Sequence, residues 1–64
     1  MVLDNITRLC KENNVSIARL ERDTEIGNGT IGRWGTSSPT LENAKKVADY
    51  FNVSVDDLMN SVEE

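Results

Sequence analysis

The residues of this 64-residue chain whose types suit contact with a ligand lie in the segment 28–34. In a helix over that segment, Ile31 and Trp34 stand three positions apart and share one face. The opposite face is polar, and it is thin because two of its members are glycines; it consists of Asn28, Gly29, Gly32 and Arg33. Such a face can approach the groove of a nucleic acid closely.

Two short helices would position this face. The pattern predicts one helix over residues 17–24 and a second over residues 28–34, with residues 25–27 breaking the helical pattern between them. Two short helices joined by a turn of about three or four residues form a helix-turn-helix, whose second helix can lie in the major groove of DNA. The spacing alone therefore indicates a helix-turn-helix.

Two glycines weaken the second of these helices. Gly29 and Gly32 each cost about 1 kcal/mol in the interior of a helix. Burial of Ile31 and Trp34 must then hold the segment against the rest of the protein. We expect this helix to be the least stable element and to be partly ordered by its ligand.

Apolar residues recur at helical spacing in three further segments, 2–13, 41–51 and 55–60. In segment 41–51 they form one continuous face, made up of Leu41, Ala44, Val47, Ala48 and Phe51. The sequence therefore predicts an all-α fold, a compact five-helix bundle that forms a single domain over residues 1–64.

The expected ends of these helices carry residues suited to capping. Ser16, Thr40 and Ser54 each precede a helix, where a hydroxyl can accept a hydrogen bond from a free backbone N–H group. Asn13-Asn14 and Asn52 are expected to end helices, because asparagine tolerates the left-handed conformation that ends many of them. Caps at both ends support the predicted boundaries.

The composition excludes several classes of function. The chain has no histidine and a single cysteine, Cys10, so it can form neither an internal disulfide nor a cysteine zinc site. No glycine-rich phosphate loop follows a strand, and a chain this short leaves little room for a substrate pocket. We expect a non-enzymatic protein without cofactor, metal ion or small-molecule substrate, in which Cys10 is a buried, small hydrophobic residue. The apolar runs are too short for a transmembrane helix or signal peptide, so we expect a soluble, cytoplasmic protein with no membrane partner.

The net charge of −4 opposes binding to nucleic acid, because phosphates require a positive potential. The acidic residues are, however, concentrated at one end. Residues 49–64 contain five acidic residues and no Lys or Arg, whereas residues 1–48 contain seven basic and six acidic residues. This distribution predicts a near-neutral DNA-binding face with an acidic far side, and weak binding by a single copy.

Four stretches of the chain resemble a known family. They are Ser16–Leu20 (SIARL), Ile31–Trp34 (IGRW), Ser38–Asn43 (SPTLEN) and Ala48–Met59 (ADYFNVSVDDLM). Together they resemble the lambdoid Cro and repressor type of helix-turn-helix DNA-binding domain over about residues 3–59. The segment 28–31 (NGTI) is similar to regulators from phages and mobile elements of Gram-positive bacteria.

The resemblance implies three groups of residues that contact DNA. Ser16 and Ile17 would present backbone N–H groups to a phosphate at a helix N-terminus. The second group would face the base edges and consists of Asn28, Gly29, Thr30 and Arg33. Of these, the Asn28 side chain suits an adenine edge and the Arg33 side chain suits a guanine edge. Ser37, Ser38 and Thr40 would bind the DNA backbone again.

Four positions depart from the family pattern. Cys10 and Gly35 replace an arginine of the first helix and an acidic residue after the recognition helix, a pair that in the family often forms a salt bridge and orients a phosphate contact. Glu25 stands where the turn usually has glycine, so we expect a wider turn or a strained residue. Glu21 replaces a small residue at the contact between the two helices. We expect Glu21 to be solvated, or paired with Arg33 or a nearby lysine.

Two functions remain open. The first is a transcriptional repressor that binds a pseudo-palindromic operator in double-stranded DNA as a dimer. The second is a protein-interaction module on the same fold, such as an antitoxin or anti-repressor domain, which suits the negative charge better. The chain is either a whole Cro-like protein or the N-terminal domain of a longer repressor.

Overall fold

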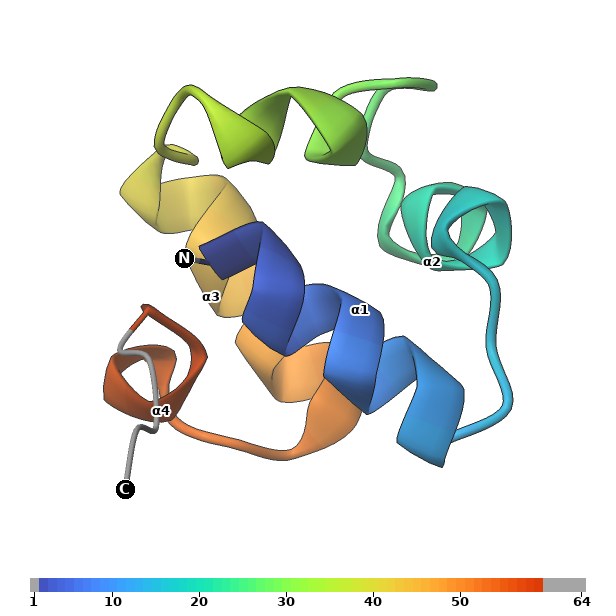
Figure 1. The fold of residues 1–64 in the computed structure, drawn as a ribbon. Coiled ribbons are helices and arrows are strands. Elements are labelled where there is room, and N and C mark those ends of the chain that lie inside the picture. The colour runs from blue at the N-terminus through green and yellow to red at the C-terminus, as the bar shows by residue number, and fades with distance from the viewer. Residues whose placement is uncertain (1, 60–64) are drawn as a thin grey trace.

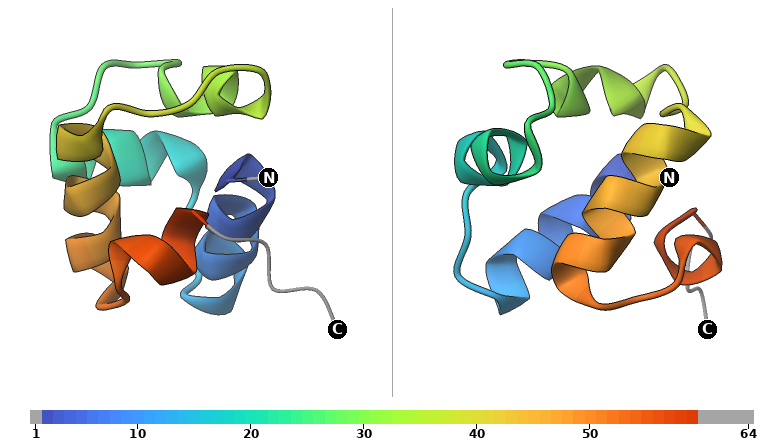
Figure 2. Two further views of the ribbon diagram at one scale, coloured as in Figure 1. Left: turned by 90° about the vertical axis from the view of Figure 1, so that its left-hand side faces the viewer. Right: turned by 180° about the vertical axis from the view of Figure 1, so that it is seen from behind.

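Helices form all the regular structure in residues 2–59, which are the residues that the computed structural model describes. They are α1 (Val2–Glu12), α2 (Ile17–Thr24), the 3-10 helix η1 (Ile31–Gly35), α3 (Leu41–Phe51) and α4 (Val55–Met59). Segment η1 lies across one end of the molecule, and the connection between α3 and α4 lies at the other end (Figures 1 and 2). The prediction of an all-α fold is confirmed.

The helix expected over residues 28–34 differs from the prediction. Residues 28–30 form a turn, and a 3-10 helix, not an α-helix, follows from Ile31 to Gly35. The described chain therefore has four α-helices rather than five. The physical reason is the left-handed conformation of Gly29, whose φ of 85° cannot continue a right-handed helix.

The predicted caps are confirmed at the N-terminal and the C-terminal ends of the helices. The hydroxyl oxygens of Ser16, Thr40 and Ser54 each accept a hydrogen bond from the backbone N–H three residues further on, at 3.0, 3.1 and 3.0 Å. Asn14 and Asn52 adopt the left-handed conformation after α1 and α3, with φ values of 62° and 60°. Helix α1 ends at Glu12, one residue before the expected bound of 13, and the expected end of the last helix at residue 60 lies outside the described residues.

One hydrophobic core joins all five elements. Its fully buried members come from each of them: Ile6, Leu20, Ile31, Val47 and Leu58. Cys10 is also buried, as predicted, and burial raises the pKa of its thiol. The Nδ2 of buried Asn5 donates to the Leu58 carbonyl oxygen at 2.9 Å, which links α1 to α4 across the core.

Leu41 is a correction to the predicted face of α3. Its side chain is 69% exposed, whereas Ala44, Val47 and Ala48 on the same helix are buried. Helical side chains lean toward the N-terminus. Leu41 is the first residue of α3, so its side chain extends beyond the turns that the neighbouring elements cover.

Tyr50 joins α3 to α2. Its hydroxyl donates to Asp23 Oδ2 at 2.8 Å, and Arg19 Nε donates to the same oxygen at 3.4 Å. The hydrogen bond from Tyr50, more than the nearby Arg19, holds the pKa of Asp23 below its ordinary value, and the same bond raises the pKa of Tyr50. The helix that precedes the turn is therefore attached to the bundle by polar as well as apolar contacts.

Candidate nucleic-acid interface

The turn after α2 is sharp because one residue takes a left-handed conformation. Glu25 has φ 62° and ψ 30°, and its backbone N–H donates to the Arg22 carbonyl oxygen at 3.2 Å. The next residue, Ile26, donates to the Glu21 carbonyl oxygen at 2.9 Å and buries its side chain in the core. Of the two possibilities raised by the sequence, the conformation of Glu25 favours strain, since side chains with a Cβ atom avoid this region.

We expect Glu25→Gly to stabilise the protein by about 1 kcal/mol, because glycine removes the steric cost of the left-handed conformation. Urea unfolding, followed through the fluorescence of the single, buried Trp34, measures the change. Glu25→Gln is the matched control, since it removes the charge and keeps the Cβ atom. An equal gain in both variants would show that charge, not backbone strain, limits stability here.

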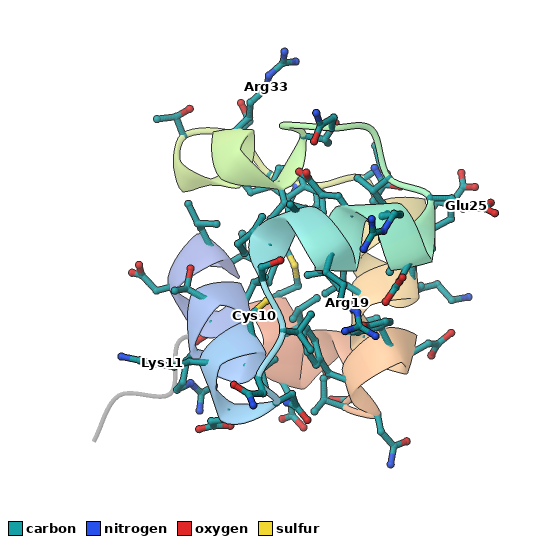
Figure 3. The ribbon with its side chains drawn as sticks, turned by 90° about the vertical axis from the view of Figure 1, so that its right-hand side faces the viewer. Cys10, Lys11, Arg19, Glu25 and Arg33 are labelled. Carbon is teal, nitrogen blue, oxygen red and sulfur yellow. The ribbon has the colours of Figure 1, made fainter. Side chains whose placement is uncertain are left out.

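Segment η1 has the two faces that its sequence predicts. Ile31 and Trp34 are buried against the core, and Gly32 and Arg33 are exposed. The Arg33 side chain extends away from the body of the protein (Figure 3). A Cβ atom placed on Gly32 would meet nothing within 4 Å. The exposed side of η1 is therefore open, with one cationic side chain projecting from it.

The other residues expected to contact DNA lie mostly at the surface. Ile17 and Thr30 are half-buried, and the exposed ones are Ser16, Asn28, Gly29, Ser37, Ser38 and Thr40. Residues 28–40 cover the end of the molecule that η1 crosses (Figure 1). Ser16 and Ile17 come from the start of α2, which packs against η1. The start of α2 and the loop after η1 therefore both lie next to η1 in the fold.

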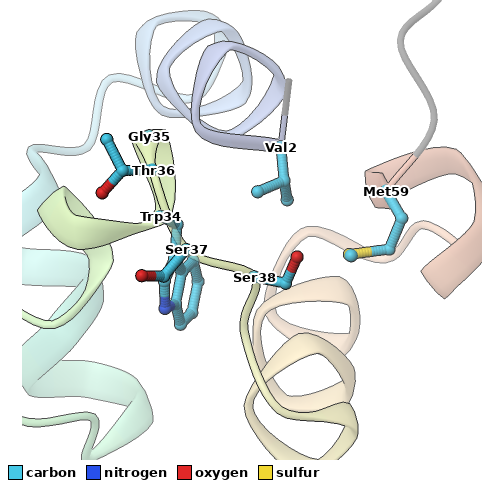
Figure 4. A pocket seen from close by; sticks show the side chains of 7 residues that line it. All are labelled: Val2, Trp34, Gly35, Thr36, Ser37, Ser38 and Met59. Atoms are coloured by element: carbon cyan, nitrogen blue, oxygen red, sulfur yellow. The ribbon is translucent and has the colours of Figure 1, made fainter.

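A shallow hollow lies behind the loop that follows η1. Its volume is about 220 Å³, and it is lined by Val2, Trp34, Gly35, Thr36, Ser37, Ser38 and Met59 (Figure 4). The backbone N–H groups of Thr36 and Ser37 both donate to the Arg33 carbonyl oxygen, at 3.1 and 2.9 Å. These bonds tie the start of the loop to η1 and leave the hydroxyls of Ser37 and Ser38 at the surface.

Glu21 is the residue of this region that the sequence analysis placed wrongly. It is not solvated, because only 4% of it is exposed, and its partners are backbone groups and not Arg33 or a lysine. Its carboxylate accepts hydrogen bonds from the backbone N–H groups of Gly29, at 3.0 Å to Oε1, and Ile31, at 2.9 Å to Oε2. The departure from a small residue at this position was the available signal, but sequence alone did not show which groups the carboxylate meets.

Within residues 2–59, no group of three or more histidine, cysteine, aspartate or glutamate side chains is arranged to hold a metal ion. In the same part of the chain, no helix has the length and apolar character needed to cross a membrane.

Two helical segments joined by a sharp turn, the second with an exposed polar side, define the class of helix-turn-helix proteins. The chain belongs to the family of Cro/C1-type helix-turn-helix DNA-binding domains, whose family model matches residues 5–64. No curated protein and no solved structure gives a significant match to the chain. The family membership makes the chain a DNA-binding regulator, and domains of this family are typically non-enzymatic.

Proposed function

We propose that the protein represses transcription by binding, as a dimer, to a pseudo-palindromic operator of the kind used by phages and mobile elements. Two copies would place their η1 segments in successive major grooves, with half-sites about one helical turn apart. RNA polymerase would then be blocked sterically. The observation that carries the proposal is the exposed Arg33 on η1, an element whose other face, Ile31 and Trp34, is fixed in the core.

In this proposal the contacts fall into base reading and backbone binding. The planar guanidinium of Arg33 suits the O6 and N7 atoms of guanine, and the amide of Asn28 suits the N6 and N7 atoms of adenine. Gly29 has no side chain and lets the backbone approach the groove, and Thr30 is half-buried beside it. Readout therefore rests on few side chains, which favours a short half-site.

Contacts to the DNA backbone would come from both sides of η1. The N-terminus of α2, at Ser16 and Ile17, presents N–H groups that attract an anion. The hydroxyls of Ser37, Ser38 and Thr40 suit phosphate oxygens. Thr40 Oγ1 already accepts a bond from the Asn43 N–H, which leaves its own proton free to be donated to a phosphate.

The charge distribution supports binding in pairs. Residues 1–48 contain seven basic and six acidic residues, so one copy supplies little net attraction to phosphates. Two copies on one operator double the number of contacts. Asp56 and Asp57, in the first turn of α4, would remain on the side away from the DNA (Figure 1).

Selection from a random pool of double-stranded DNA tests this function. We expect enrichment of a palindromic motif with half-sites about one turn apart. Binding to that motif should weaken steeply as salt rises, because each phosphate contact releases counterions. A folded protein that enriches no sequence at low salt would refute the proposal and leave a protein partner, to which the net charge of −4 is better suited.

A further inference from the structure

Glu21 bonds to the turn that carries the DNA-binding segment. Its side chain reaches from α2 to the backbone N–H groups of Gly29 and Ile31, eight and ten residues further along the chain. We propose that Glu21 is a positioning residue: its carboxylate holds the turn and η1 against α2, and so sets where Asn28 and Arg33 stand relative to the α2 N-terminus. This inference rests on the proposed DNA-binding function.

The burial of this carboxylate calls for an explanation, because a buried charge is costly unless it is paired or hydrogen-bonded. Among the described residues, the ion pairs given by the structure do not include Glu21. Instead, one oxygen accepts the backbone N–H of Gly29 in the turn, and the other accepts that of Ile31, the first residue of η1, where unbonded N–H groups carry partial positive charge. The carboxylate therefore acts as the N-terminal cap of η1. The adjacent Thr30 supplies no side-chain cap.

The two bonds restrain this segment where other restraints are few. Gly29 has a left-handed φ of 85° and no side chain, and the space where a Cβ atom would stand is open. The two oxygens of one carboxylate hold the N–H groups on either side of Thr30. Two bonds to one rigid group restrain both the position and the rotation of the backbone. Arg33 lies two residues after Ile31, and Asn28 lies immediately before Gly29, so both side chains are carried by the restrained backbone.

The same bonds decide which groups remain for DNA. The N–H groups of Gly29 and Ile31 are occupied by Glu21 and are not offered to a phosphate. Segment η1 would therefore contact DNA through side chains, chiefly Arg33, and not through its N-terminus. Phosphate binding by backbone groups would fall to α2, whose position relative to η1 is set by the same carboxylate.

Glu21→Gln tests the inference with little change of shape. The amide keeps one acceptor oxygen but presents an NH₂ group to the second backbone donor, so one of the two bonds is lost. The probes are a labelled duplex that carries the selected site and a scrambled duplex of the same composition. We expect Glu21→Gln to bind the selected duplex at least about tenfold more weakly, with a smaller loss on the scrambled one. Amide hydrogen exchange should accelerate at Gly29 and Ile31 in the free protein.

Ser54→Ala is the matched control. It also removes a side-chain cap from a backbone N–H, that of Asp57, but it does so at the start of α4 and not beside η1 (Figure 1). We expect this variant to unfold more easily and to bind the selected duplex as the unaltered protein does. Both variants are compared where far-ultraviolet circular dichroism shows them to be folded.

The outcomes separate the inference from the proposed function. An unaltered protein that binds neither duplex overturns the proposed function and this inference with it. If the unaltered protein binds and Glu21→Gln binds equally well, the inference alone is overturned. Equal losses in Glu21→Gln and Ser54→Ala also overturn it, because general destabilisation would then explain both. A loss confined to Glu21→Gln, with faster exchange at Gly29 and Ile31, supports it.

Discussion

Ile31→Ala is expected to destabilise the protein by about 2–5 kcal/mol, since Ile31 is fully buried and truncation leaves a cavity. A chain of 64 residues has a total unfolding free energy of only about 3–10 kcal/mol. The substitution therefore removes a large part of it. In a domain of this size, Tm should fall by about 10 °C or more. Thermal unfolding followed by circular dichroism measures this shift.

Gly32→Ala is the control in the same element. A Cβ atom at Gly32 meets no other atom within 4 Å, so alanine fits without strain. Alanine restricts the unfolded chain, so the free energy of unfolding should stay the same or rise by up to about 1 kcal/mol. Tm should therefore be unchanged or higher. An Ile31→Ala protein with the Tm of the unaltered protein would show that η1 is not held by its buried face. The expectation that burial holds this glycine-containing segment would then be wrong.

The features of this fold that the sequence predicts are those decided by near neighbours. Ser16, Thr40 and Ser54 cap helices through bonds that span three residues, and Asn14 and Asn52 end helices through their own backbone preference. The alternation of buried and exposed residues in segment 31–34 depends only on helical spacing. In each case the residue and its partner lie within one turn of each other.

The features that the sequence did not predict depend on partners further along the chain. Glu21 was expected to be solvated, or paired with Arg33 or a lysine, because a charged side chain is seldom buried without a charged partner. Its true partners are the N–H groups of Gly29 and Ile31, which come close only after the turn has formed. Leu41 shares the apolar periodicity of α3, but no pattern tells where the neighbouring elements cease to cover that helix.

The candidate interface was predicted in part. The sequence and its family resemblance assign a set of contact residues, and the structure shows that most of them are exposed. Exposure is necessary for contact with DNA but does not establish it. The assignment of individual residues to bases or phosphates therefore stays a prediction, and Arg33 is the residue whose substitution separates the possibilities best.

Arg33→Ala is expected to weaken binding to the selected operator by about 1–3 kcal/mol, which corresponds to about five- to 150-fold in Kd. The reason is the loss of a bidentate contact between the guanidinium and a guanine. Specificity should relax at one position of each half-site, and the slope of affinity against salt should change little. Repeating the selection with the variant measures the relaxed position directly.

Two further substitutions distinguish a base contact from a general effect of charge. Arg33→Lys keeps the positive charge but loses the planar fork, so a base contact predicts that discrimination falls while non-specific binding persists. Lys11→Ala removes one positive charge from α1, well away from Arg33 (Figure 3), and should leave operator binding nearly unchanged. If Arg33→Ala instead weakened binding to all sequences uniformly and lowered the salt slope by about 1, Arg33 would contact a phosphate. Binding that is unaffected by Arg33→Ala would make Arg33 a solvated surface residue, and base reading would then have to come from Asn28.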